Sequence, residues 1–191
     1  VGSELPTPST EPRVADDHLT LGVRDLSVLD GSGRPTLDRV SLDVYRGEIV
    51  GVAGVEGNGQ GELIEAILGL RLASGGQLLL DGEDIGSWPV RRRREAGIGY
   101  VPEDRHRRGL LLDAPLWENA MLGHQTMAPF ARGPFLDRSG ARSATTRIVE
   151  HFDVRTPGID TSARALSGGN QQKLVIGREM AASPRLLVAA H

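Results

Sequence analysis

Gly54-Val55-Glu56-Gly57-Asn58-Gly59-Gln60-Gly61-Glu62 is the stretch that decides the fold of this sequence, because of what lies on either side of it. The preceding run, Ile49 to Ala53, is apolar without alternation, which is typical of a strand covered on both faces. From Glu62 to Gly69 the apolar residues fall on one helical face, and the glycine marks a helix end. A buried strand joined to a helix through a glycine loop predicts an α/β fold with a central strand at residues 49–53.

Further elements are expected on both sides of this unit. Residues 19–23 and 40–44 alternate apolar with polar side chains, and turn-forming residues 30–35 separate them, which predicts a hairpin. The middle of the chain, about residues 114–161, is interpreted as mostly helical. Additional strands are predicted at residues 78–80, 98–101 and 186–190.

The composition narrows the class of protein. The chain has 191 residues, a formal charge of -3 and no cysteine, which suits one soluble domain and excludes disulfides, thiolate metal sites and cysteine nucleophiles. Residues 1–18 have the proline and acidic residues of a flexible linker, not the pattern of a signal peptide. Among the 22 Lys and Arg residues only Lys173 is a lysine, so a phosphate-binding lysine is missing everywhere else. Without a basic excess, nucleic acid is not the expected partner.

The glycine loop has the backbone of an anion site but not its charged side chains. Its N–H groups and the positive end of the following helix are suited to phosphate. The spacing Gly54-x4-Gly59 fits the phosphate loop G-x-x-x-x-G-K-[ST] through its second glycine. Gln60 then stands in place of the phosphate-binding Lys, and Gly61 in place of the Mg²⁺-binding hydroxyl. On this segment alone, a plain glycine turn is an equally good interpretation. The dinucleotide fingerprint G-x-G-x-x-G fails, because Glu62 stands at its third glycine.

A second glycine motif, Leu166-Ser167-Gly168-Gly169-Asn170-Gln171-Gln172-Lys173, opens another helix. Ser167 is suited to cap that helix, and its hydroxyl and the first N–H groups again favour an anion. A capped helix start is the plain alternative. The full octet, however, resembles the signature motif of ABC transporter ATPases, and its distance from the glycine loop is similar to that in the family.

The resemblance covers nearly everything from Leu19 to His191. It implies an ABC-type P-loop NTPase nucleotide-binding domain over residues 19–191, with an antiparallel β part at residues 19–45 and an α-helical subdomain at about 112–165. One subgroup is especially similar, the second ATP-binding half of tandem ABC proteins that import nucleosides, with simple-sugar importers close behind. Three segments carry this closer likeness: Gly54 to Gln60, Pro102 to Gly109 and Phe152 to Pro157.

The resemblance also shows losses. Leu186 to Ala189 is similar to the Walker B strand, but Ala190 and His191 stand where the family has its Mg²⁺-organising Asp and its general base Glu. Glu103 occupies the place of the Q-loop glutamine, and Leu29-Asp30 the place of an adenine-stacking aromatic residue. The D-loop, the switch histidine and the remaining strands are expected beyond His191. The domain is therefore expected to be truncated at the Walker B strand and to hold no catalytic residue.

In this family two units face each other head to tail, so the signature of one completes the ATP site of the other. The resemblance implies that this signature acts in trans on the partner half's ATP, while the chain's own loop binds nucleotide weakly. ATP and Mg²⁺ are the implied cofactors, mainly at the partner's site, and this chain alone is expected to hydrolyse ATP negligibly. The signature residues are Ser167, Gly168, Gly169 and Asn170, and the degenerate loop comprises Gly54, Gly57, Asn58, Gly59, Gln60, Gly61 and Glu62.

The implied partners are the N-terminal ATP-binding half of the same polypeptide, transmembrane permease subunits and, indirectly, an extracellular substrate-binding protein. The implied location is peripheral, at the cytoplasmic face of the plasma membrane. Glu103, Arg105, Arg107 and Arg108, at and after the Q-loop position, are the expected permease-facing surface, with a plain solvated loop as the alternative. Arg91 to Arg94 are interpreted as a solvated helix face.

Two other functional classes stay open at this point. One is a soluble ABC-type protein that acts on ribosomes or DNA, with arginines contacting phosphates. The other is a catalytically silent module that regulates a partner. No metal site is expected, because His106, His124 and His151 lack metal-ligand spacing.

Overall fold

The computed structural model describes residues 17–55 and 57–190. The linker expected at residues 1–18 falls almost wholly outside the described residues, as does His191. The strands are β1 (Leu19–Leu29), β2 (Pro35–Tyr45), β3 (Gly75–Leu80), β4 (Glu83–Asp84), β5 (Ile98–Val101), β6 (Ala131–Arg132), β7 (Phe135–Leu136) and β8 (Leu186–Ala189). The helices are α1 (Gln60–Leu68), α2 (Val90–Glu95), α3 (Arg105–Arg108), α4 (Leu116–Ala120), α5 (Arg138–His151) and α6 (Gly168–Ala181), with a 3-10 turn, η1, at Ala163–Ala165.

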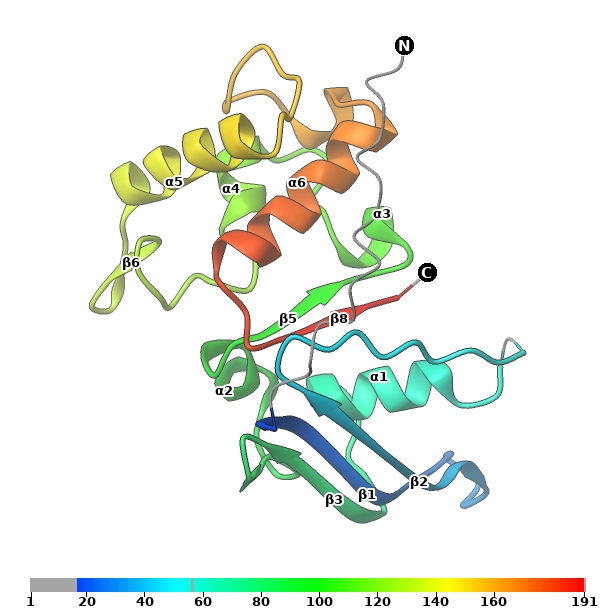
Figure 1. Ribbon diagram of the computed structural model, residues 1–191. Helices are drawn as coiled ribbons and strands as arrows, with labels where there is room; N and C mark the ends of the chain where they lie inside the picture. The colour runs from blue at the N-terminus through cyan, green and yellow to red at the C-terminus, as the bar shows by residue number, and fades with distance from the viewer. Residues whose placement is uncertain (1–16, 56, 191) are drawn as a thin grey trace.

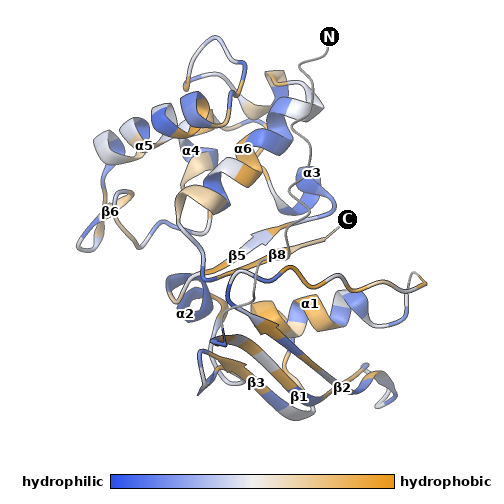
Figure 2. Cartoon of the chain, in the orientation of Figure 1, coloured by the Kyte–Doolittle hydropathy of each residue, from blue (hydrophilic) through white to orange (hydrophobic). Residues whose placement is uncertain are grey.

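An antiparallel sheet in the order β2-β1-β3-β4 forms one layer, and α1 lies beside it (Figure 1). The predicted hairpin is confirmed, because β1 and β2 pair antiparallel with Val23 opposite Leu42. The Asp30 carboxylate accepts the N–H groups of Ser32 and Arg34 in the turn between them. Alternate residues of β1 and one face of α1 are apolar and share a core, which Figure 2 shows as orange bands on both elements.

A parallel pair of strands, β5 and β8, lies between the antiparallel sheet and helices α4, α5 and α6 (Figure 1). Both strands were predicted and are confirmed. The strand predicted at residues 49–53 is wrong: this segment belongs to no strand, and Ile49 is 97% exposed. A central strand needs hydrogen-bonded neighbours, and among the described residues β5 and β8 pair only with each other. Apolar composition without a pairing neighbour does not make a strand.

A lobe built on α4, α5 and α6 covers the other side of the β5–β8 pair (Figure 1). Its core includes Leu116 and Ala120 from α4, Ile148 from α5, and Leu174 and Val175 from α6. The prediction of a mostly helical middle is only partly right, because turns and the small β6–β7 hairpin separate α4 from α5. Proline lacks the N–H that a helix interior needs, and Pro129 precedes this hairpin while Pro134 lies in its turn. No helix in the described part of the chain has the length and apolarity to cross a membrane.

The interpretation of Arg91 to Arg94 as a solvated face is wrong for half of the cluster. Arg93 is 1% exposed and donates to the carbonyls of Ala66 and Ile67, at the end of α1. The last carbonyls of a helix lack partners within it, and the planar guanidinium supplies several donors at once. Burial lowers the pKa of Arg93. Arg94 also turns inward, so α2 is a connecting element between two layers.

Candidate functional site

Backbone conformation explains the glycines of the first loop. Gly57 and Gly59 have φ values of 85° and 98°, a region that disfavours residues with a side chain. Gly59 is the N-cap of α1 without any side-chain capping bond, and a Cβ there would lie 2.7 Å from the carbonyl oxygen of Thr36. The loop therefore packs against β2 in a way that only glycine permits.

The side chain of Gln60 folds back onto this loop. Its Oε1 accepts the N–H of Asn58 at 3.2 Å, and its Nε2 donates to the carbonyl of Val55 at 3.1 Å. The Asn58 side chain donates to the same carbonyl. A Cβ at Gly54 would collide with Gln60 Nε2. A neutral amide thus engages the loop backbone where a phosphate site has a cation.

The two residues after Gln60 add no positive charge to this site. Gly61 is exposed and offers no hydroxyl, while Glu62 places a carboxylate in the first turn of α1. That carboxylate already interacts favourably with the positive end of the helix. An incoming phosphate would meet it as a like charge. The residues present therefore do not fit the Mg²⁺-phosphate group that a complete loop of this kind holds.

The signature helix begins differently. Ser167 is the N-cap of α6, and its Oγ accepts from the N–H of Asn170 at 3.4 Å and from Asn170 Nδ2 at 3.0 Å. The Asn170 Oδ1 in turn accepts the N–H of Arg155. A Cβ at Gly169 would meet no described atom within 4 Å, so this side of the first turn is open. Ser167 accepts from Asn170 and keeps its own hydroxyl proton to donate to an anion.

The basic segment after β5 is divided by the structure. Asp104 caps α3 by accepting the N–H groups of His106 and Arg107. Glu103, Arg107 and Arg108 are exposed. Arg105 turns toward α6 and donates to Gln171. The predicted permease-facing surface is therefore exposed on one side only.

The chain's own loop and its signature lie in different layers. The loop begins α1 beside the antiparallel sheet, whereas the signature begins α6 in the helical lobe (Figure 1). Lys173, the single lysine, is on α6 and binds the Asp153 carboxylate at 2.7 Å. It does not replace the cation missing at Gln60.

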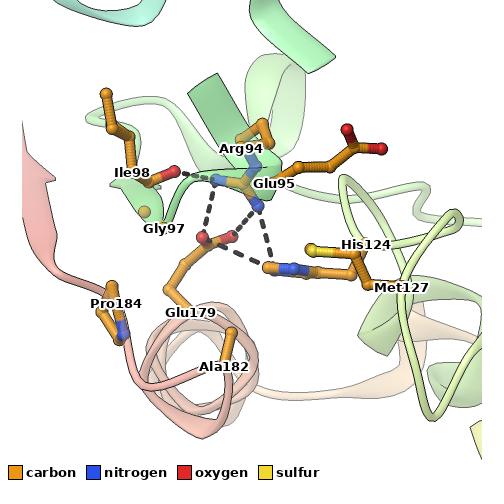
Figure 3. A pocket seen from close by; sticks show the side chains of 10 residues that line it. Arg94, Glu95, Gly97, Ile98, His124, Met127, Glu179, Ala182 and Pro184 are labelled. Carbon is orange, nitrogen blue, oxygen red and sulfur yellow. Dashed lines mark hydrogen bonds and ion pairs between the residues drawn. The ribbon is translucent and has the colours of Figure 1, made fainter. Parts of the chain in front are cut away.

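Sequence reasoning missed a buried charged cluster at the other end of α6 (Figure 3). Glu179, 1% exposed, accepts from Arg94 at 2.8 Å and from Arg178 at 2.9 Å, and it lies near His124. Burial alone would raise the pKa of Glu179, but the nearby His124, the hydrogen bond from Arg94 and the charge of Arg178 lower it to about 2. A cavity of about 70 Å³ adjoins the cluster. These contacts join α2 of the β layer to the helical lobe.

A family model described as ABC transporter matches residues 37–189. The chain belongs to the ABC transporter family. It is 44% identical to the guanosine import ATP-binding protein NupO of Bacillus subtilis, over 95% of this chain and 36% of that protein. It is 42% identical to the nucleoside import ATP-binding protein NupA of Lactococcus lactis, over 90% of this chain and 34% of that protein. With the glucose import ATP-binding protein TsgD13 of Haloferax volcanii the identity is 42%, over 99% and 35%.

The chain thus spans about a third of the length of these relatives. Among solved structures it is similar to a nucleotide-free ATP-binding cassette of an ABC transporter, with a TM-score of 0.73 at 22% identity over 90% of this chain and 68% of that one. A dimeric post-hydrolysis cassette bound to ADP and Pi gives 0.72 at 20% identity over 88% and 72%. These matches confirm the predicted fold class, the P-loop NTPase fold of ABC type.

Proposed function

We propose that this chain is the second nucleotide-binding half of a tandem ATPase subunit of an ABC importer for nucleosides. Its signature serves the ATP held by the partner half, and its own loop does not support turnover. The observation that carries the proposal is the contrast between the two helix starts. The loop at α1 is engaged by Gln60 and lacks a cation, whereas the start of α6 is capped, open and able to donate hydrogen bonds.

The roles of the signature residues follow from this geometry. The first N–H groups of α6 and the positive end of its dipole face outward, toward where a partner presents the γ-phosphate. Ser167 donates its hydroxyl proton, and Asn170 holds the Ser167 oxygen in place. Gly169 leaves room for the phosphate to approach the backbone. Gly61 and Ala190 offer Mg²⁺ no side-chain oxygen, so the Mg²⁺ that neutralises phosphate charge would be held at the partner's site.

The relatives support the importer and its substrate class. The guanosine and nucleoside import proteins are 44% and 42% identical to this chain, which spans 36% and 34% of their lengths. Those fractions suit one half of a tandem protein. The partners are then an N-terminal ATP-binding half, membrane permease subunits and an extracellular binding protein, with this chain at the cytoplasmic face of the membrane.

The test is the steady-state ATPase activity of the complete tandem protein assembled with its membrane subunits. Gly169→Asp places a carboxylate against the partner's γ-phosphate and lowers activity about 100-fold or more. Gln60→Ala changes a site that already lacks its main charges and leaves activity within about twofold. Equal losses, or a larger loss from Gln60→Ala, contradict the proposal.

Two further assays separate the alternatives. Uptake of labelled guanosine against labelled glucose in vesicles distinguishes a nucleoside importer from a sugar importer, which the 42% identity to the glucose import protein keeps as the second candidate. Copurification with an integral membrane permease, and not with RNA, excludes a soluble nucleic-acid-associated protein.

A further inference from the structure

Helix α3 presents two different faces. Arg107 and Arg108 are exposed, whereas Arg105 is half-buried; Arg105 and the exposed His106 both bond to α6 through their side chains. None of the four residues of α3, all within the described part of the chain, is buried. Polar contacts, rather than an apolar core, therefore hold this helix in place.

The contact on α6 is the side chain of Gln171. This residue is buried and lies one turn after Ser167. Its Nε2 donates to the carbonyl of Ala163 at 3.0 Å, so its Oε1 faces α3. That single oxygen accepts from His106 Nε2 at 2.8 Å and from Arg105 Nε at 3.3 Å.

Arg105 also reaches the signature itself. A Cβ at Gly168 would lie 2.8 Å from Arg105 Nη2, so the guanidinium lies directly against the first residue of α6. At the far end of α3, the carbonyl of Gly109 accepts from buried Arg178 at 2.9 Å. The helix is thus attached to α6 at two places, one at its end and one at the signature.

We propose that Arg105 and His106 are positioning residues for the signature, and that their contacts with Gln171 and Gly168 hold the first turn of α6 in place. The inference rests on the proposed function, in which the signature meets ATP in trans. A helix with no buried side chain moves at little cost in packing. Because Arg178 holds Gly109 at the far end, the position of the start of α3 depends on the bonds of Arg105 and His106 to Gln171.

The experiment uses the complete transporter in lipid nanodiscs and compares two double variants. One is Arg105→Met with His106→Leu. The matched control is Arg142→Met with His151→Leu, which removes the same residue types from α5, where Arg142 binds Asp160 and His151 is exposed. Two quantities are measured: the kcat and KM of ATP hydrolysis, and hydrogen exchange of the peptide spanning Ser167 to Gln171.

The Arg105/His106 double variant lowers kcat about tenfold, because a misplaced signature fails to meet the phosphate. Its KM changes less, and hydrogen exchange rises in the signature peptide while other peptides keep the control's rates. His106→Gln, whose amide still donates toward Gln171, recovers exchange protection and kcat that His106→Leu loses. A loss of folding alone would raise exchange throughout and would not distinguish these two single variants.

The inference is overturned if the signature peptide exchanges as in the Arg142/His151 control, or if His106→Gln behaves as His106→Leu does. Hydrogen exchange decides this without reference to ATP. If Gly169→Asp leaves ATPase activity intact, the proposed function fails, whereas raised exchange in the Arg105/His106 variant still supports the positioning role.

Discussion

The glycine-rich starts of α1 and α6 have the same kind of backbone and opposite surroundings. Gly59 caps α1 in a conformation that needs glycine, and Gln60 closes the loop from the inside. Ser167 caps α6 with its side chain, and the turn beyond it is open at Gly169. A helix N-terminus attracts anions in general, so the neighbouring side chains make the two helix starts different as anion sites.

The two helices also differ in how their C-terminal ends are held. The almost fully buried Arg93 donates hydrogen bonds to carbonyls in the last turn of α1. On α6 the corresponding region carries its own charged residues: Glu179 accepts from Arg94 of α2, and Arg178 donates to the carbonyls of Gly109, at the end of α3, and Asn119 of α4. Helix α6 is therefore held to α2 through Glu179 and to α3 and α4 through Arg178.

The largest effect on the unfolding free energy is expected at the buried cluster of Glu179, Arg94 and Arg178. Glu179→Gln removes the negative charge between Arg94 and Arg178, which are 13% and 6% exposed, and leaves two buried cations without compensation. Loss of one member of a buried ion pair costs about 3–5 kcal/mol of unfolding free energy. Urea denaturation at neutral pH measures this loss. The control is Glu83→Gln, whose carboxylate is exposed and whose loss costs less than about 1 kcal/mol.

The contribution of Glu179 to the unfolding free energy depends on pH. The folded-state pKa of Glu179, about 2, lies below its ordinary value of 4.5. A depressed carboxyl pKa contributes stability above the ordinary pKa, and this contribution is lost as the pH falls through the folded value. The difference in unfolding free energy between the wild-type chain and Glu179→Gln therefore shrinks as the pH falls from 4.5 toward 2. A difference that stays constant over this range would contradict the assignment of the charge to Glu179.

Replacing glycine by alanine is expected to change the unfolding free energy in opposite directions at the two helix starts. Gly59→Ala lowers the unfolding free energy by about 2 kcal/mol, because φ is 98° and the added Cβ meets the backbone of Thr36. Gly169→Ala raises it by about 0.5 kcal/mol, because the added Cβ enters open space in a helical turn. Thermal unfolding of both variants tests this pair. Destabilisation by Gly169→Ala would mean that the first turn of α6 is not open.

Local patterns predicted the parts of this structure that local forces determine. Alternation identified β1 and β2, a glycine identified the end of α1, and Ser167 identified the start of α6. The strand expected at residues 49–53 failed because pairing depends on neighbours that an apolar run does not specify.

Contacts between residues far apart in the sequence could not be predicted from local patterns either. Arg93 and Arg94 look alike within a run of arginines, and only the fold places one on α1 and the other on Glu179. The bond between His106 and Gln171 joins residues 65 positions apart. In the candidate site, the motif letters located both glycine segments, but the closure of the loop by Gln60 depends on its side-chain conformation.

A further test of the difference between the two helix starts restores the cation and the hydroxyl that the loop before α1 lacks. Gln60→Lys with Gly61→Ser removes the amide that engages the loop and supplies a cation and a hydroxyl. Nucleotide binding tightens about tenfold, which equals about 1.4 kcal/mol and is in the range of one hydrogen bond to a charged group. Calorimetry with ATP measures it. Tight ATP binding by the unmodified loop would contradict this prediction, because it would mean that the hydrogen bonds of Gln60 to the loop do not weaken binding.

Two substitutions at Ser167 separate its capping of α6 from its proposed role toward the phosphate. Ser167→Ala removes the oxygen that accepts from Asn170 and lowers the unfolding free energy by about 1 kcal/mol. Ser167→Asp keeps an equally good cap, and its charge suits the helix dipole, so stability is retained. The same carboxylate repels a γ-phosphate at the start of α6. Ser167→Asp therefore leaves the thermal midpoint unchanged while it lowers the ATPase activity of the complete protein more than Ser167→Ala does. If activity instead followed stability across the two variants, Ser167 would act only as a cap, and the contrast between the two helix starts would lose its functional meaning.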